Sequence, residues 1–500
     1  MTEPAHAVGP GTGRATVPAM QAVVAIHGMG EQRPMDTIKG FVRAVWETDD
    51  AITRKGLPDP TEVWSKPDAR TGSLELRRIT TRESIPSKEF PAGVRADFYE
   101  LYWADLTAGS TWDQFVAWVF GLLIRPWRRV PPDVRLAWLA LWVASLVVAA
   151  LAVIGVLPAT VWRCTPWPWM GDWHWLLAAI ALVATAGIHR MVAATFGRVV
   201  RYTQADPDNI AARAAVRKRG LALLRALHHG AYARIIIVGH SLGSMLAHDL
   251  LSYFWAERNA ARMIDKDSTE FDTLSALEYA ASGVERHDPS RAALAEYFAA
   301  QRQMRLRLAQ RPAPDPHDPA APDRRWLISD LITLGSPLTH AEFLIAADKS
   351  DLQRRISDRE LPEAPPFPEL LDPAIRKLAI ATRKLPIATP PEDSRLMSFP
   401  VPPRYAAWEL HHAAPFAVVR WTNIYDPAEL VFFSDIVSGP LAGVFGPAII
   451  DVNLKELRGR QSWSFTHTNY WTLDRDPIHI RALRAAVNLL DRADANPNKV

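Results

Sequence analysis

Residues 234–257 read RIIIVGHSLGSMLAHDLLSYFWAE, and this stretch decides the fold. The run Arg234–Val238 is rich in β-branched side chains, which is typical of a strand buried in a parallel sheet. A helix is predicted directly after it, over Leu242–Trp255. The turn between them, Gly239-His240-Ser241-Leu242-Gly243, places a serine where two glycines leave room for a sharp bend. Such a bend lifts the serine hydroxyl to the carboxyl edge of the sheet and points the helix N-terminus at the reacting group.

Strand and helix segments alternate on both sides of this stretch. Strands are predicted at 22–26, 73–82, 95–104, 326–334 and 417–424, and helices at 36–48, 208–230 and 477–491. This alternation favours the α/β class, with a mostly parallel sheet and helices on both of its faces.

The composition excludes several classes of protein. Hydrophobic residues make up 48% and charged residues 22% of the 500 residues, which is enough apolar material for a large core. The net charge of +3 is small for 500 residues and does not indicate the concentrated basic face of a nucleic-acid-binding protein, so a nucleic-acid partner is not expected. A single cysteine, Cys164, excludes an internal disulfide framework and fits a reducing compartment. No metal-binding motif and no phosphate-binding glycine loop stands out, so neither a metal nor a cofactor is expected.

Two apolar runs predict a transmembrane hairpin inserted into this fold. Residues 136–157 carry no charge, and a helix of that length spans roughly 33 Å, enough to cross a hydrocarbon core of about 30 Å. The second run, at about 173–192, is shorter. It spans the bilayer only if the bilayer thins locally or flanking side chains snorkel to the interface. Arginines gather before the first run and after the second, and tryptophans gather in the loop between them. This pattern predicts that the rest of the protein faces the cytosol at the cytoplasmic (inner) membrane.

These signals divide the chain into eight parts. They are a disordered tail (1–20), the first part of the α/β domain (21–110), a membrane-associated insertion (111–205), the part with the serine strand (206–257), a helical insertion (258–325), a further strand (326–338), a Pro-rich cap or lid (339–415) and the C-terminal part of the α/β domain (416–500).

The serine turn and a second motif resemble those of a known superfamily. Gly239-His240-Ser241-Leu242-Gly243 resembles the nucleophile elbow of the α/β-hydrolases, in the form frequent among lipases and esterases. Upstream, Ile26-His27-Gly28-Met29-Gly30 resembles the oxyanion loop of that superfamily. The resemblance implies that Met29 and Leu242 donate the two backbone N–H groups that stabilise the tetrahedral oxyanion. It gives His27, Gly28, Gly239, His240 and Gly243 supporting roles, and His240 a role in packing.

The same resemblance implies an acid after a late strand, within residues 421–431, which read WTNIYDPAELV. Two carboxylates compete for this role. Glu429 precedes an apolar pair, as the acid does in many lipases, whereas Asp426 lies closer to the end of the strand. Glu429 is the favoured acid, Asp426 the alternative and Asp435 a distant third.

The resemblance places the catalytic histidine last in the chain order. His467, in the segment 465–471 (FTHTNYW), follows the acid, lies in a loop and precedes the final helix, so it is the favoured base. His411 and His412 precede the acid strand, and His479 falls within the last helix, which makes these three histidines the alternatives.

Together these residues predict a membrane-anchored serine hydrolase that cleaves carboxylic esters through an acyl-enzyme. Ser241 attacks the carbonyl, His467 moves the proton, and Glu429 or Asp426 orients the imidazole. The predicted partners are an acyl-ester substrate, for which the hairpin suggests a lipid, and the membrane. Thioesterase, acyltransferase and amidase chemistry use the same residues, and a non-catalytic membrane scaffold that keeps the fold is the alternative of another class.

Overall fold

The computed structural model describes most of the chain outside the region of the apolar runs. The described residues are 18–28, 33–53, 62–107 except 74, 207–382 except 316, 319 and 320, 395–427, 438–459, 467, 469–473 and 478–500, with isolated positions between 126 and 179.

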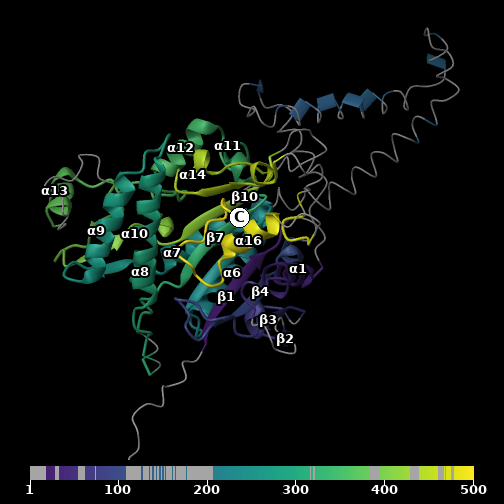
Figure 1. Ribbon diagram of the computed structural model, residues 1–500. Helices are drawn as coiled ribbons and strands as arrows, with labels where there is room; N and C mark the ends of the chain where they lie inside the picture. Colours follow the sequence, from purple (N-terminus) through teal and green to yellow (C-terminus); the bar gives the residue numbers. More distant parts are fainter. Residues whose placement is uncertain are drawn as a thin grey trace, which may run out of the picture.

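An eight-stranded sheet forms the centre of the molecule, in the order β11-β10-β7-β5-β1-β4-β3-β2 (Figure 1). The strands are β1 (Ala19–Ile26), β2 (Val63–Pro67), β3 (Arg77–Thr81), β4 (Val94–Leu101), β5 (Arg234–His240), β7 (Ile328–Leu334), β10 (Arg420–Tyr425) and β11 (Ile450–Asn453). All neighbours from β11 to β4 are parallel, and only β3 and β2 add antiparallel pairs at one edge. The predicted mostly parallel α/β sheet is therefore confirmed.

Helices pack on both faces of this sheet. The longer ones are α6 (Pro207–His228), α7 (Leu242–Glu257), α9 (Thr269–Ser282), α10 (Arg291–Ala309) and α16 (Ile478–Val487). The shorter ones are α1 (Asp36–Val42), which runs on into a π-helical turn (Arg43–Glu47), α8 (Asn259–Arg262), α11 (Ala341–Leu344), α12 (Lys349–Ser357), α13 (Pro373–Thr382), α14 (Ala442–Phe445) and α15 (Leu454–Arg458). A small antiparallel sheet joins the two insertions, with β6 (Met263–Asp265), β9 (Ala407–Leu410) and β8 (Ser398–Pro400) in that order.

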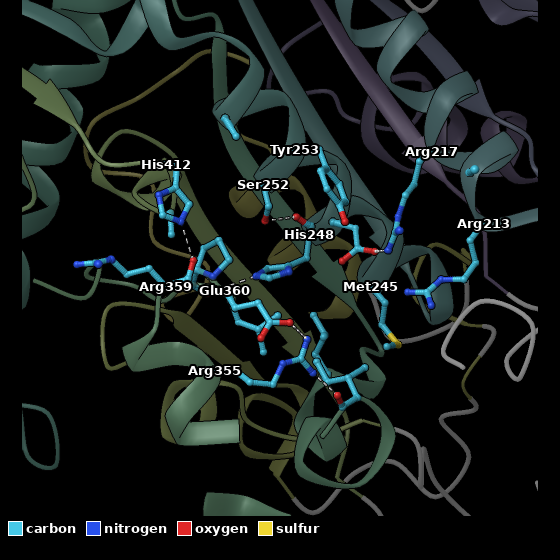
Figure 2. A pocket seen from close by; sticks show the side chains of 18 of the residues that line it. Arg213, Arg217, Met245, His248, Ser252, Tyr253, Arg355, Arg359, Glu360 and His412 are labelled. Carbon is cyan, nitrogen blue, oxygen red and sulfur yellow. Dashed lines mark hydrogen bonds and ion pairs between the residues drawn. The ribbon is translucent and has the colours of Figure 1, made fainter. Parts of the chain in front are cut away.

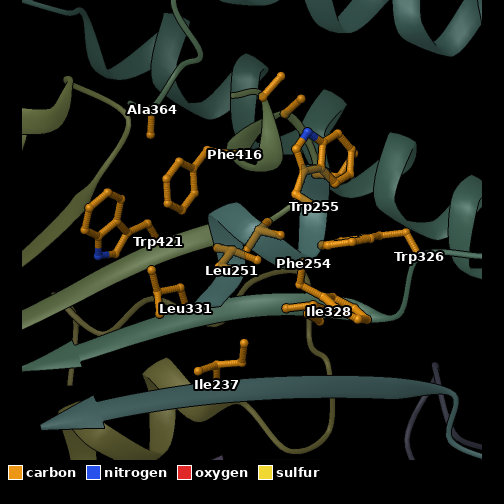
Figure 3. Close-up of a cluster of buried hydrophobic side chains, with 14 of the residues drawn as sticks. Ile237, Leu251, Phe254, Trp255, Trp326, Ile328, Leu331, Ala364, Phe416 and Trp421 are labelled. Carbon is orange, nitrogen blue, oxygen red and sulfur yellow. The ribbon is translucent and has the colours of Figure 1, made fainter. Parts of the chain in front are cut away.

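The strand β5 is buried on both faces, as its unbroken apolar run predicts. Ile235 and Ile237 belong to one core, which includes side chains of α6, α7, α9 and α10. Ile236 and Val238 point the other way, into a core with α1 and α16. Figure 3 shows the first core, where Trp255 of α7 meets Trp326 edge to face at 4.7 Å between ring centroids. Alternate side chains thus fix the register of the central strand between two layers of helices.

The chain changes direction across the sheet between β1 and β5. After β1 the chain forms β2, β3 and β4, which lie on one side of β1. The later strands β5, β7, β10 and β11 lie on its other side. In open α/β sheets, ligands bind outside the carboxyl ends of the strands at such a switch point. Here those ends are Ile26 of β1 and His240 of β5. The two motifs that the sequence analysis describes, at 26–30 and 239–243, lie at these ends.

A buried cluster of charged side chains lies at the opposite edge of the sheet, where the parallel strands begin. We call it the arginine–aspartate cluster; it consists of Arg234, Arg305, Arg420, Asp330 and Asp491. Arg420 lies 2.7 Å from Asp330, and Arg305 lies 2.9 Å from Asp491. Although burial opposes ionisation, Arg420 and Arg234 hold the pKa of Asp330 well below its usual range. The cluster ties β5, β7 and β10 to α10 and to the segment that follows α16.

Two predictions from the sequence, the N-terminal tail and the membrane runs, can be compared with the residues that the structure describes. The strand β1 begins at Ala19, which pairs with Val94, so the folded chain starts within the predicted tail at 1–20. The predicted membrane runs, at about 136–157 and 173–192, lie almost wholly outside the described residues. Among the residues that the structure does describe, no helix is long and apolar enough to cross a membrane.

Candidate active site

Ser241 occupies a strained backbone conformation between β5 and α7. Its φ of 52° and ψ of −129° lie where side-chain-bearing residues are rarely found. Such a conformation costs about 1–3 kcal/mol and persists only where the surroundings enforce it. The Ser241 amide donates to the carbonyl of Leu334 at the end of β7 (2.9 Å), and the Ser244 amide donates to the Ser241 carbonyl (2.9 Å). The serine is thereby fixed at the carboxyl end of the central strand, directly before the N-terminus of α7.

Glycines allow the close packing around this serine. A Cβ on Gly28 would lie 2.6 Å from the Cβ of Ser241, so the loop after β1 passes directly against the serine. A Cβ on Gly239 would lie 2.6 Å from the carbonyl oxygen of Gly243, and one on Gly243 would lie 2.5 Å from that of His27. Each position therefore excludes any larger residue unless backbone moves.

His27 shapes the loop after β1 from within. Its buried ring is stacked on Trp103 with 2° between the planes, and its Nε2 accepts the Trp103 amide at 3.2 Å. That acceptor role puts the ring proton on Nδ1, which lies 2.8 Å from the Gly28 carbonyl and donates to it. The ring is thus neutral and occupied on both nitrogens, which suits the supporting role predicted for His27. Met29, the predicted oxyanion donor that follows, lies outside the described residues.

A chain of hydroxyl groups supports the elbow from the side of β7. The Ser244 hydroxyl donates to the Ser241 carbonyl at 2.5 Å and lies 2.6 Å from the Ser336 hydroxyl. Ser336 in turn accepts the amide of Leu338 at 3.2 Å. All three serines are buried. Ser244 and Ser336 could not be predicted as parts of the site, because single serines in a helix and a loop carry no signal of their own.

The structure places His467 beside the elbow. The His240 ring donates through Nε2 to the His467 carbonyl at 2.7 Å, and the two ring centroids lie 4.9 Å apart. The His240 ring also meets the edge of Trp471 at 4.8 Å between centroids. His240, the residue before Ser241, therefore connects the histidine loop to the serine turn. This contact brings His467 into the same region as Ser241, and the roles predicted for His240 and His467 stay predictions.

The carboxylate Asp426 follows β10, at the same edge of the sheet as Ser241. It is 3% exposed and forms an ion pair with Arg458 of α15. A buried carboxylate needs such a partner to stay ionised. Glu429, the favoured acid, and Asp435 lie outside the described residues, so the choice between the two leading carboxylates stays a prediction. Arg458 was not anticipated, since an arginine 32 residues from its partner has no sequence signature.

The three alternative histidines bond to other segments. His411 contacts the Phe367 carbonyl at 2.8 Å, and burial lowers the pKa of His411 to about 3. His412 contacts the Arg359 carbonyl at 3.2 Å, and His479 of α16 contacts the Thr472 carbonyl at 2.7 Å. In the described part of the chain, no group of three or more His, Cys, Asp or Glu side chains is arranged to hold a metal ion.

A buried glutamate holds the residue that precedes α1. Glu100 lies near the carboxyl end of β4, where it pairs with Ala25 of β1, and its carboxylate accepts the Met35 amide at 2.7 Å. Met35 itself has a φ of 74° and precedes α1. Burial, helped by the nearby Asp36, raises the pKa of Glu100 to about 7 although the Met35 amide opposes this. Glu100 is therefore a carboxyl group that exchanges its proton near neutral pH.

We expect Glu100→Gln to flatten the pH dependence of stability. The pKa of Glu100 is higher in the folded chain, about 7, than the usual 4.5, so its contribution is complete below pH 4.5 and is lost as the pH rises through 7. The loss amounts to about 3 kcal/mol in the free energy of unfolding. Urea unfolding at pH 4.5 and pH 8 measures it, with the exposed Glu296→Gln as the control. Equal pH dependence in wild type and Glu100→Gln would contradict the prediction.

Comparisons of the chain with protein-family models, with curated proteins and with solved structures found no match.

Proposed function

We propose that this chain is a serine hydrolase of the α/β-hydrolase superfamily that cleaves carboxylic esters, with Ser241 as its nucleophile. The observation that carries the proposal is the strained Ser241 backbone at the switch point of the sheet. A structural turn between a strand and a helix does not need a serine in a conformation that glycine adopts at no cost. A nucleophile does need it, because the strained turn presents the hydroxyl at the edge of the sheet and in front of a helix N-terminus.

The proposed reaction has two halves. The Ser241 oxygen forms a bond to the ester carbonyl carbon while His467 accepts the serine proton, and collapse of the tetrahedral intermediate expels the alcohol, which takes that proton. Water then attacks the acyl-enzyme, again losing a proton to His467, and the carboxylic acid leaves as Ser241 regains its proton. The backbone amides of Leu242 and Met29 stabilise the oxyanion in both halves. Glu429 or Asp426 holds the imidazole in the required tautomer.

We further propose a cytosolic orientation at the inner membrane. The support for it is the pair of apolar runs at about 136–157 and 173–192, with arginines at their outer ends. An anchor of this kind keeps the catalytic sheet near the bilayer and favours lipophilic acyl esters as substrates.

Labelling with a fluorophosphonate tests the proposal. Such a reagent phosphonylates an activated serine, so we expect the detergent-solubilised protein to be labelled at Ser241 and Ser241→Ala to resist labelling. Ser290→Ala is the matched control, because Ser290 caps α10 far along the chain from the elbow. Labelling that survives in Ser241→Ala, or no labelling of the folded wild type, would falsify the assignment.

A further inference from the structure

Both peptide groups that flank Ser241 are held from the end of β7. The Ser241 amide donates to the carbonyl of Leu334, the last residue of β7, at 2.9 Å. The Ser241 carbonyl accepts two bonds from Ser244, one from its amide at 2.9 Å and one from its hydroxyl at 2.5 Å. Ser336, just beyond the end of β7, lies 2.6 Å from that hydroxyl. The end of β7 and the first turn of α7 therefore set the strained angles of Ser241.

The hydroxyl groups beside the elbow all donate toward Ser241. Because a hydroxyl group has a single proton, the Ser244 hydroxyl, which donates to the Ser241 carbonyl, accepts from the Ser336 hydroxyl. The Ser336 oxygen in turn accepts the Leu338 amide at 3.2 Å. We call this run, from the Leu338 amide through Ser336 and Ser244 to the Ser241 carbonyl, the serine chain. Each of its bonds polarises the next in the same direction, which strengthens the last bond, at the Ser241 carbonyl.

The serine chain is enclosed by protein. A cavity of about 690 Å³ lies beside α7 and is lined by side chains of α6, α7 and α12 (Figure 2). Met245 and Leu338 are among the described residues that line this cavity, whereas the three serines are not. Each of the three serines is at most 2% exposed. The Ser241 carbonyl thus takes its bonds from Ser244 where bulk water does not compete, and hydrogen bonds are stronger in such surroundings.

The Ser241 carbonyl and the Leu242 amide belong to one peptide group. That group is planar and trans, so its C=O and N–H bonds point in opposite directions. The serine chain directs the carbonyl toward Ser244, into the first turn of α7. The Leu242 N–H therefore points out of the N-terminus of the helix. It is one of the first four amides of α7, which have no acceptor within the helix.

We propose that Ser244 and Ser336 are positioning residues that hold the Leu242 amide toward the oxyanion. Through the shared peptide group, their bonds to the Ser241 carbonyl fix the direction of the Leu242 N–H before a substrate arrives. A donor that is fixed in advance stabilises the developing charge without reorganisation. This inference rests on the proposed hydrolase function, since acyl transfer at Ser241 is the reaction that forms the oxyanion.

Replacement of Ser244 by alanine tests the proposal in the full-length, detergent-solubilised protein. The Ser244 amide still holds the Ser241 carbonyl, so the Leu242 N–H is loosened and not lost. We expect kcat for p-nitrophenyl butyrate to fall about tenfold with KM almost unchanged, whereas removal of an oxyanion donor costs roughly a hundredfold or more. Ser275→Ala is the matched control, because Ser275 is buried in α9 and its hydroxyl donates to the Phe271 carbonyl at 2.9 Å.

Inhibition by octyl trifluoromethyl ketone separates positioning from folding. In the proposed mechanism the Ser241 oxygen adds to the carbonyl carbon of the ketone, the serine proton passes to His467, and the carbonyl oxygen becomes a stable oxyanion. We expect Ser244→Ala to raise the inhibition constant by the same factor of about ten that it takes from kcat. A loss of folded protein would lower the measured kcat and leave the inhibition constant as it is. An unchanged inhibition constant, or an unchanged kcat, in Ser244→Ala would therefore overturn the proposal.

A double variant tests the part of Ser336. Since Ser336 is proposed to act through the Ser244 hydroxyl, the double variant Ser244→Ala, Ser336→Ala should be no slower than Ser244→Ala alone. Losses that add up would overturn the role of Ser336.

The wild type decides the proposed function separately. If it neither turns over the ester nor is inhibited by the ketone, the hydrolase is rejected, and the positioning role with it. A wild type that is active, beside a Ser244→Ala variant of equal activity, rejects the positioning role alone.

Discussion

Replacement of Ser241 by alanine is expected to lower kcat for a p-nitrophenyl ester by roughly 10⁵-fold and to leave KM almost unchanged. In the proposed mechanism the hydroxyl is the attacking group, so its loss removes the covalent route altogether and leaves only binding and the proposed oxyanion donors. The fold should survive, because alanine keeps the Cβ that meets Gly28 and adopts the same backbone angles as serine. Steady-state kinetics on purified protein measures the change.

A glycine at the same position sharpens that result. Ser241→Gly should be as inactive as Ser241→Ala but about 1 kcal/mol more stable in urea, because glycine relieves the strain at a φ of 52°. An active Ser241→Gly or Ser241→Ala would show that another group performs the attack.

Two carboxylate variants complement this result in the same assay. Glu429→Gln should lose activity while remaining folded. Asp426→Asn should lose stability in addition to activity, since it leaves the buried Arg458 without its carboxylate.

Gly243→Ala should destabilise the protein by about 3 kcal/mol or more. Its new Cβ would lie 2.5 Å from the His27 carbonyl oxygen and also against that of Ile26. Both oxygens belong to the end of β1, which is hydrogen-bonded to β4 and β5 and cannot retreat without breaking the central sheet. The urea midpoint of unfolding, with an unchanged slope, measures the loss.

Gly443→Ala provides the control for this substitution. Gly443 lies in α14, and a Cβ there would meet nothing within 4 Å. Alanine is a better helix former than glycine, so this variant should be as stable as the wild type or slightly more stable. If the two alanine variants unfold at the same urea concentration, the close approach between β1 and α7 does not exist.

The central strands could be predicted because they are buried on both faces. Ile235 to Val238 form a continuous apolar run that only a strand between two helical layers requires. The edge strands gave no such signal: Trp64, Ser65 and Lys66 of β2 are exposed or half-buried, so no alternation marks them. The small sheet was missed for a different reason. Its pairs, such as Ile264 with Trp408, join short segments that are far apart in the sequence.

The candidate site could be predicted only where a motif fixes the backbone. Close contacts exclude a Cβ at Gly28, Gly239 and Gly243, so the glycines of both motifs have a structural reason. The arginines that line the cavity beside α7, among them Arg213, Arg217 and Arg355, have no comparable signal. Arginine and lysine are common throughout the chain, and only folding brings α6 and α12 to the same side of α7.

The arginine–aspartate cluster also sets the order in which the molecule can mature during synthesis. The ribosome makes Arg234 first, then Arg305, Asp330 and Arg420, and Asp491 only after a further 71 residues. Until Asp491 emerges, Arg305 has no carboxylate at its final position, and its burial between α10 and the sheet is unfavourable. The nascent chain therefore holds an incomplete sheet edge until Asp491 has been made. Until then that edge of the sheet is one of the incompletely packed surfaces that make folding intermediates prone to aggregate.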